Sequence, residues 1–229
     1  MDAKRGSDFP NLRQRNLVDQ VADVLTEAII ERRFKPGERL SEVQLSRDMG
    51  ISRAPVREAA RLLESRGLLV SRPRRGFFVR ELDRDDLNDV FDLRLCLERH
   101  AFRLLVSSFS PEMHMTLNRQ VEIMCDVAKD REDNRKIEED LRFHRMIFEM
   151  AGNSRLLKTF DDLAHELRLC MALIGRTHSA PDSISTSHWR LIDALISGDP
   201  ARCEEEVDYH IGVARDYVIQ GISEAQAAR

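Results

Sequence analysis

The sequence lacks several features that would set it apart from an ordinary globular protein. No apolar run approaches the roughly 18–20 residues of a membrane span, and the charged N-terminus has no apolar segment of the kind found in signal peptides. The four cysteines are widely spaced and form no CxxC pair, so we expect reduced thiols that fill a core, with a redox sensor as the alternative. Internal repeats and low-complexity segments are absent as well. We therefore expect a globular, cytoplasmic protein.

Charge is unevenly distributed along the 229 residues. Residues 1–80 hold 17 Lys and Arg against 11 Asp and Glu, whereas the rest of the chain holds 19 against 29. The first part is therefore basic and the second part acidic, although the net charge of the whole chain is only −4. An apolar fraction of 42% is enough for a sizeable core. The charge asymmetry predicts two domains that meet near Arg80.

Two short helical patterns lie in residues 41–67. Ser41 begins the first with the pattern of a capping box, and Gly50 ends it. Ser52 is expected to cap the second helix, and Gly67 marks the end of that helix. This arrangement predicts a pair of helices joined by a tight turn.

Strand-like runs at residues 68–70 and 77–79 follow these helices, and Gly76 between them can adopt a positive φ. A longer helical pattern over about residues 13–33 precedes them, and residues 38–40 fit a further short strand. Together these elements predict a winged helix-turn-helix.

Arginines are concentrated in this segment and indicate its partner. Residues 51–80 contain eight Arg and two Glu. Arg53 and Arg57 lie on one face of the second helix, at spacing i, i+4. A recognition helix enters the major groove with its N-terminal residues leading. We therefore predict that the segment binds double-stranded DNA, and a solvated basic face is the alternative.

The sequence SRAPVREA at Ser52–Ala59, followed by a wing that ends in RGFFV, resembles the DNA-binding domain of GntR-type bacterial transcription regulators. The resemblance covers about residues 12–80. It implies that Arg53 and Arg57 contact an operator. It also implies that four further residues help to hold the DNA, namely Arg47, Ser52, Arg75 and Gly76.

The second half of the chain shows only helical patterns. Six helices are expected at about residues 85–107, 111–129, 132–151, 154–176, 183–197 and 201–219. Short connections predict an antiparallel six-helix bundle, in which facing helices build ligand sites. The fold class is therefore mostly α. The expected domain division is a mobile tail at 1–11, a DNA-binding domain at 12–80, a linker at 81–84 and an all-helical domain at 85–222.

Four side chains of the helical half are candidates for a metal site. Asp140 and His144 share one face of the third bundle helix. His188 and His210 lie about eleven residues to either side of Asp199, so an antiparallel hairpin would bring them to the same level. One carboxylate and three imidazoles suit a divalent transition metal, with zinc as the first choice and nickel, manganese or iron as others. Alternatively, each histidine is an isolated interior or surface residue.

Residues 85–220 resemble the FCD effector domain found in the FadR branch of GntR-type regulators. The motifs that carry the resemblance are sparser here: the sequence DLRFH at Asp140–His144, the pair Gly152 and Asn153, and isolated histidines further on. The resemblance implies that the metal ligands are Asp140, His144, His188 and His210. The histidines that match no ligand position are His100, His114, His165 and His178.

Arg94 and Glu98 are charged residues on a helix face that is expected to point into the bundle. Charges in a core need partners. One interpretation is that the two side chains form an ion pair. The other is that Arg94 binds the carboxylate of an effector that also contacts the metal, because a guanidinium matches a carboxylate geometrically.

These predictions combine into one hypothesis. The chain would be a homodimeric transcription regulator, a repressor rather than an activator, that binds a pseudo-palindromic operator and responds to a small organic acid. Residues 80–84 would transmit the response between the domains. The hypothesis includes no membrane partner and no catalytic residues. Two alternatives stay open: a sensor for which the metal alone is the signal, and a metal-dependent hydrolase with a DNA-binding appendage.

Overall fold

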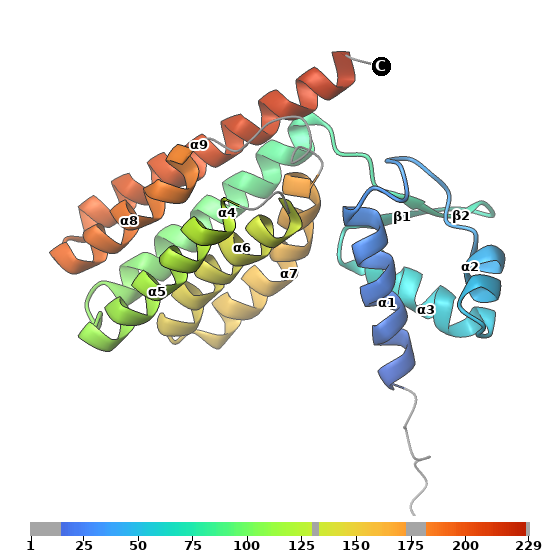
Figure 1. The fold of residues 1–229 in the computed structure, drawn as a ribbon, viewed down its shortest axis with the longest axis horizontal. Helices are drawn as coiled ribbons and strands as arrows, with labels where there is room; N and C mark the ends of the chain where they lie inside the picture. Colours follow the sequence, from blue (N-terminus) through green and yellow to red (C-terminus); the bar gives the residue numbers. More distant parts are fainter. Residues whose placement is uncertain (1–14, 130–132, 173–181, 228–229) are drawn as a thin grey trace, which may run out of the picture. The chain divides into compact units, whose positions relative to one another are not determined.

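The computed structural model of the protein describes residues 15–129, 133–172 and 182–227, and it is mostly helical, as predicted (Figure 1). Within these ranges the chain forms nine helices and two strands in two compact units, which are divided between Arg80 and Glu81. Among the described helices, none combines the length and the apolarity that a membrane span requires. The expected tail at residues 1–11 lies outside the described residues.

The first unit is a winged helix-turn-helix. Helix α3 packs against α1, α2 and the first strand, and its buried side includes Val56, Ala59 and Leu63. The elements of this unit are α1 (Arg15–Ile30), α2 (Glu42–Asp48), α3 (Arg53–Ser65), β1 (Leu69–Arg72) and β2 (Gly76–Val79).

Local signals explain most boundaries of this unit. The amide of Gln44 donates to the hydroxyl of Ser41 at 3.3 Å, which caps α2, and Gly50 turns the chain with a φ of 65°. The prediction for Ser52 was wrong in part: Ser52 occupies the N-cap position of α3, but within the described residues its side chain makes no capping hydrogen bond.

The wing is an antiparallel pair in which Ser71 lies opposite Phe77 and Arg72 opposite Gly76. The predicted strand at residues 38–40 is reduced to a single bridge between Arg39 and Phe78. Two backbone hydrogen bonds hold this segment beside β2: Leu40 donates to the Phe77 carbonyl, and Val79 donates to the Glu38 carbonyl, each at 2.9 Å.

The second unit is a bundle of six helices. Helix α4 packs against α6, α7 and α9, while α8 packs against α5 and α9 (Figure 1). The helices are α4 (Arg84–Leu105), α5 (Pro111–Val127), α6 (Asp133–Met150), α7 (Ser154–Ala172), α8 (Asp182–Ser197) and α9 (Pro200–Ala227). A capping box starts α4, because Asp83 and Asp86 each accept a hydrogen bond from the backbone amide of the other.

Helix α9 is longer than predicted, because the prediction placed the end of this helix near Ile219. The helix continues through Gly221 to Ala227, and Ile222 is buried with 8% of its surface exposed. A glycine within a helix costs only about 1 kcal/mol, and burial of one more isoleucine is enough to offset that cost.

The cysteines only partly follow the expectation of core-filling thiols. Cys170 and Cys203 are buried, and burial raises the pKa of the Cys203 thiol to about 11. Cys125 is half-buried, whereas Cys96 is exposed. Arg94 and Glu98 lie on the buried side of α4, four residues apart. Cys96 is two residues from each of them, so it lies on the opposite, exposed side of the helix.

Candidate metal centre and nucleic-acid interface

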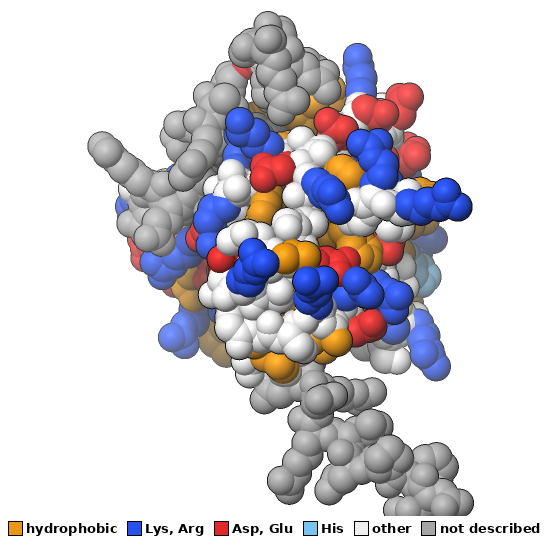
Figure 2. All heavy atoms as spheres, turned by 90° about the vertical axis from the view of Figure 1, so that its right-hand side faces the viewer, with side chains coloured by type: hydrophobic (Ala, Val, Ile, Leu, Met, Phe, Trp, Pro, Cys, Tyr) orange, Lys and Arg blue, Asp and Glu red, His pale blue; other side chains and the backbone are white. Residues whose placement is uncertain are grey.

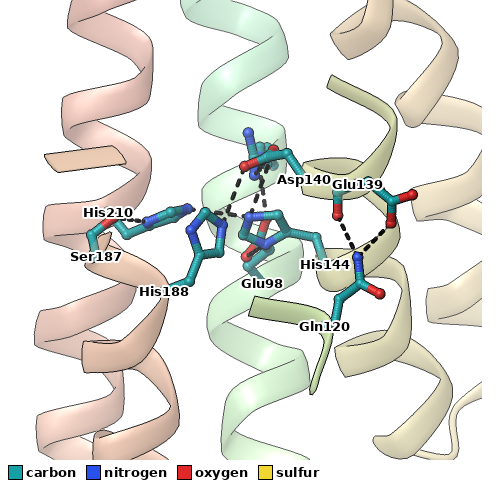
Figure 3. A network of polar contacts seen from close by, with 9 residues as sticks. Glu98, Gln120, Glu139, Asp140, His144, Ser187, His188 and His210 are labelled. Atoms are coloured by element: carbon teal, nitrogen blue, oxygen red, sulfur yellow. Dashed lines mark hydrogen bonds and ion pairs between the residues drawn. The ribbon is translucent and has the colours of Figure 1, made fainter. Parts of the chain in front are cut away.

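The structure brings together the four side chains that the sequence singled out. Asp140 and His144 come from α6, His188 from α8 and His210 from α9, and the three imidazoles point toward one another (Figure 3). One ligand atom from each of the four residues lies within 4.8 Å of the others. The three histidines are buried and Asp140 is half-buried.

The pairing of His188 with His210 depends on the hairpin formed by α8 and α9. Their ring centroids are 4.4 Å apart, and the ring of His144 lies 5.1 Å from that of His210. Phe143 packs edge-on against His188 at 4.8 Å and forms an apolar wall of the cluster. The packing of α6, α8 and α9 is therefore sufficient to bring the three histidines together.

Two contacts orient the imidazoles. Nδ1 of His144 lies 2.8 Å from Oε2 of Glu98, and Nδ1 of His210 lies 2.7 Å from the hydroxyl of Ser187. The Nε2 atoms of His144 and His210 are thereby directed at each other, 3.2 Å apart. Two nitrogen ligands of one tetrahedral metal, each about 2.0–2.1 Å from it, would be separated by about the same distance.

Burial governs the ionisation of the cluster. It lowers the pKa of His144 below its ordinary value and lowers that of His210 further, so both are neutral near pH 7. Burial opposes ionisation of Asp140, yet the hydrogen bond with His188 and the electrostatic effects of His144, His188 and Arg94 together outweigh it and lower the pKa of this carboxyl group. The pKa of Glu98 is also lowered, because its interactions with His144 and Arg94 outweigh burial.

Arg94 fits both interpretations that the sequence left open. Its Nε donates to Oε1 of Glu98 at 2.8 Å, and neither side chain is exposed. Its Nη1 and Nη2 atoms, however, have no hydrogen-bond partner among the described residues. Nη2 lies 3.8 Å from Oδ2 of Asp140, which also lacks a hydrogen-bond partner there. One of the three guanidinium nitrogens is thus paired with Glu98, and Nη2 lies near the carboxylate of Asp140.

The residues present suit a divalent metal ion. Neutral imidazoles and an ionised carboxylate are the forms in which these groups bind metals. The two carboxylates outnumber the one guanidinium, so an excess negative charge favours a cation. When Nδ1 of His210 donates to Ser187, the lone pairs of the two facing Nε2 atoms repel each other unless a cation lies between them.

Sequence reasoning missed the contacts that support the cluster. Ser187 directly precedes His188, yet a serine in a helix carries no signal that it contacts a histidine 23 residues away. The ion pair of Glu98 with Arg94 was anticipated, but its contact with His144 was not. Of the other histidines, His100 is exposed and His114 and His165 are half-buried, while His178 lies outside the described residues.

The predicted DNA-contacting residues share the surface of the first unit. The exposed ones are Arg47, Ser52, Arg53, Arg57 and Arg75, whereas Gly76 is half-buried and has a φ of 88°. Lys and Arg side chains recur across the face shown in Figure 2. In the wing, the guanidinium groups of Arg72 and Arg75 lie 4.4 Å and 5.6 Å from the centre of the Phe78 ring.

Arg57 also has a partner within the protein. Its Nε and Nη2 atoms lie 3.0 Å and 2.8 Å from Oε2 of Glu42, the first residue of α2. This hydrogen bond raises the pKa of Arg57. No local pattern indicates this pair, because fifteen residues and a turn separate the two positions.

Known proteins resemble the chain over both units. Residues 17–79 match the family described as bacterial regulatory proteins, gntR family, and residues 89–213 match the FCD domain. A probable D-xylose utilization operon transcriptional repressor of Paenarthrobacter nicotinovorans is 30% identical over 200 residues, covering 87% of this chain and 88% of the relative. The uncharacterized regulator YdhC of Bacillus subtilis is 28% identical over 192 residues, covering 83% and 86%.

A solved structure shows the same fold. The E. coli protein McbR/YncC superposes with a TM-score of 0.75 at 22% identity, covering 89% of this chain and 97% of that one. The relatives are transcription regulators, so the hydrolase alternative finds no support in the family. The winged helix-turn-helix, the helical bundle and these matches lead to one conclusion: the chain belongs to the GntR family, carries an FCD domain, and is a DNA-binding transcriptional regulator rather than an enzyme.

Proposed function

We propose that the protein is a homodimeric repressor whose affinity for its operator is controlled by a small organic acid bound beside a divalent metal ion. The observation that carries the proposal is Arg94: it is fully buried, yet two of its three nitrogens have no hydrogen-bond partner among the described residues. Leaving charged donors unpaired in a core is costly. A ligand carboxylate would complete their hydrogen bonds.

The metal would be held by Asp140, His144, His188 and His210, with zinc as the first choice and nickel, manganese or iron as others. Three imidazole nitrogens and one carboxylate oxygen fill a tetrahedral shell, so a further ligand would bind by raising the coordination number of the ion to five or six. The ion would supply a Lewis-acidic contact for an anion. Arg94 would orient that anion, because its Nη2 atom lies 3.8 Å from Oδ2 of Asp140 and so adjoins the proposed ligand set.

The first unit would grip the operator through α3 and the wing. Arg53 and Arg57 are exposed on α3, where side chains of a recognition helix meet base edges. Arg47, Ser52 and Arg75 would contact the phosphate backbone, and the positive φ of Gly76 would let the wing approach a groove. Two copies of the chain related by a two-fold axis would read a pseudo-palindromic sequence.

Regulation would require the acid to bind one arrangement of the dimer better than the other, because a ligand shifts an equilibrium only by that difference. Residues 81–84 connect the two units covalently and would transmit the change in arrangement from the helical bundle to the DNA-binding unit. We expect the acid to weaken DNA binding. The assignment as a repressor is supported by the name of the Paenarthrobacter relative, a probable operon repressor.

The test is a DNA titration with defined metal and acid. Duplexes are first selected from a random library with the full-length protein, and binding is then measured by fluorescence anisotropy with zinc-loaded and chelator-treated protein. A panel of mono-, di- and tricarboxylic acids is added to each. We expect at least one acid to lower the affinity of the zinc-loaded protein about tenfold, which corresponds to a coupling within the usual 1–3 kcal/mol.

Arg94→Lys serves as the matched variant, because it keeps the buried positive charge but loses the paired donors of a guanidinium. This variant should still bind zinc and the selected DNA but should no longer respond to the acid. An affinity that stays constant with every acid would contradict the proposal. An affinity that follows zinc alone, with or without acid, would favour the metal-only sensor instead.

A further inference from the structure

An acidic side chain lies beside the surface that is proposed to read DNA. Glu42 begins α2, directly after the capping residue Ser41, and Arg57 lies in α3. Both Nε and Nη2 of Arg57 contact the same oxygen of Glu42, at 3.0 Å and 2.8 Å. The arginine side chain is 54% exposed and the glutamate only 19%. Glu42 is thus the better anchored partner, and Arg57 extends outward from it.

From this geometry we infer that Glu42 is a positioning residue for DNA recognition: it fixes Arg57 so that the free edge of the guanidinium reads a guanine in the major groove. The inference rests on the proposed role of Arg57 in contacting the operator, and it adds a second residue and a specific base. It does not depend on the metal or the acid.

The donor geometry of arginine supports the choice of base. A guanidinium has five N–H donors in a planar fork. Glu42 occupies the side formed by Nε and one hydrogen of Nη2. The end formed by Nη1 and the other hydrogen of Nη2 stays directed away from the glutamate. Two parallel donors at this spacing match O6 and N7 of guanine, the commonest specific contact of arginine in the major groove.

Fixing the side chain beforehand also favours binding. A free arginine loses rotamer freedom when it contacts a base, and an arginine that is already held loses less. Glu42 is suited to hold it, because a carboxylate in the first turn of a helix is stabilised by the helix dipole. The packing of α2 against α3 fixes the distance between the two backbones.

A carboxylate near DNA also has a cost, because it repels the phosphates. Glu42 could therefore have the opposite role, in which it merely masks Arg57 until DNA displaces the glutamate. The two roles predict different affinities after Glu42 is replaced. A masking residue lowers the affinity for every sequence, so its removal should strengthen all binding. A positioning residue raises the affinity for the correct sequence, so its removal should weaken that binding while strengthening binding to unrelated DNA.

The experiment uses the full-length protein and its variants E42Q, R57A and D48N. Each is used to select duplexes from the same random library, and its affinity is then measured for the duplex chosen by the wild type and for an unrelated duplex. Asp48→Asn is the matched control. The substitution also removes one negative charge from α2, but Asp48 accepts its hydrogen bond from Gln44 rather than from Arg57.

We expect E42Q to bind the wild-type duplex about tenfold more weakly, within the range by which one bidentate base contact discriminates. Its affinity for unrelated DNA should rise about twofold, because one phosphate-repelling charge has gone. The sequences that it selects should lose the preference for one guanine per half-site, and R57A should lose the same preference. D48N should retain it. A combined E42Q and R57A variant should be no less selective than R57A alone.

Three results would decide against the inference. If E42Q retains the guanine preference, Glu42 does not position the arginine. If E42Q binds both duplexes more tightly, masking is the correct account. If R57A itself retains the guanine preference, the proposed role of Arg57 fails and the inference fails with it. If R57A loses the guanine preference but E42Q retains it, only the role of Glu42 is overturned.

Discussion

Oε2 of Glu98 lies 2.8 Å from Nδ1 of His144, and both side chains are fully buried. The other carboxylate oxygen of Glu98 accepts a hydrogen bond from Nε of Arg94. One carboxylate therefore joins a proposed metal ligand to the proposed anchor of the acid. Movement of Arg94 toward a bound carboxylate would alter the support of His144, so the two sites should respond to each other.

Replacement of Glu98 by glutamine should weaken metal binding. The neutral amide polarises the imidazole of His144 less than a carboxylate does, and its NH₂ group competes for the same space as the donors of Arg94. Loss of such an outer contact usually lowers metal affinity about 10–100-fold. Competition with a chromophoric chelator measures the change. Glu139→Gln is the control, because Glu139 adjoins Asp140 in sequence but bonds to Gln120 (Figure 3). Equal affinities of E98Q and wild type would contradict the assigned role.

Removal of His210 should abolish most of the stabilisation by zinc. A ligand that binds only the folded state at 100 times its Kd stabilises it by about 2.7 kcal/mol. His210→Ala should therefore show a much smaller rise in Tm on addition of zinc than the wild type does. The exposed His100 is the position for a matched His100→Ala control. An undiminished zinc response of H210A would remove this histidine from the proposed ligand set.

The metal-free protein should lose stability as the pH falls below about 6.5, the pKa of an unperturbed histidine. Burial lowers the pKa of His144 and His210, so the unfolded chain takes up protons that the folded chain does not. Each histidine should then reduce the free energy of unfolding by about 1.4 kcal/mol per pH unit, until its folded pKa is reached. The lowered pKa values of Glu98 and Asp140 add a further loss only at more acidic pH.

Urea unfolding at several pH values between 7.5 and 5.5, with a chelator present, measures this dependence. His210→Ala should flatten the slope, whereas His100→Ala should leave it unchanged. A slope that is the same in all three proteins would show that other groups cause the pH dependence.

Truncation of a stacked aromatic pair should destabilise the bundle strongly. Phe148 of α6 and Phe160 of α7 are both fully buried, and their ring centroids are 4.3 Å apart. Phe160→Ala should lower the free energy of unfolding by about 3–5 kcal/mol, because it removes apolar contacts and leaves a cavity. Met115 is 64% exposed, so Met115→Ala should change the free energy of unfolding by less than about 0.5 kcal/mol. Urea unfolding followed by circular dichroism makes the comparison, and similar losses in both variants would contradict the packing shown.

Local patterns explain which parts of the fold were predictable. The spacing of Asp140 and His144 places them on one face of any α-helix, whatever that helix packs against. The helix-turn-helix follows from the cap of Ser41 and the turn at Gly50, since these act within a few residues. Prediction was weaker where packing overrides the local signal. The last helix was expected to end near residue 219, yet α9 continues through Gly221 to Ala227 and buries Ile222.

The sequence by itself determined a basic winged helix-turn-helix, an acidic helical bundle and four residues suited to a metal, because charge, helical period and hairpin symmetry are local or additive properties. Only the tertiary structure decided which side chains support them: Glu98 with His144, Ser187 with His210, and Glu42 with Arg57. Each of these pairs joins different helices, and its contact depends on how those helices pack and on the side-chain rotamers that the packing permits.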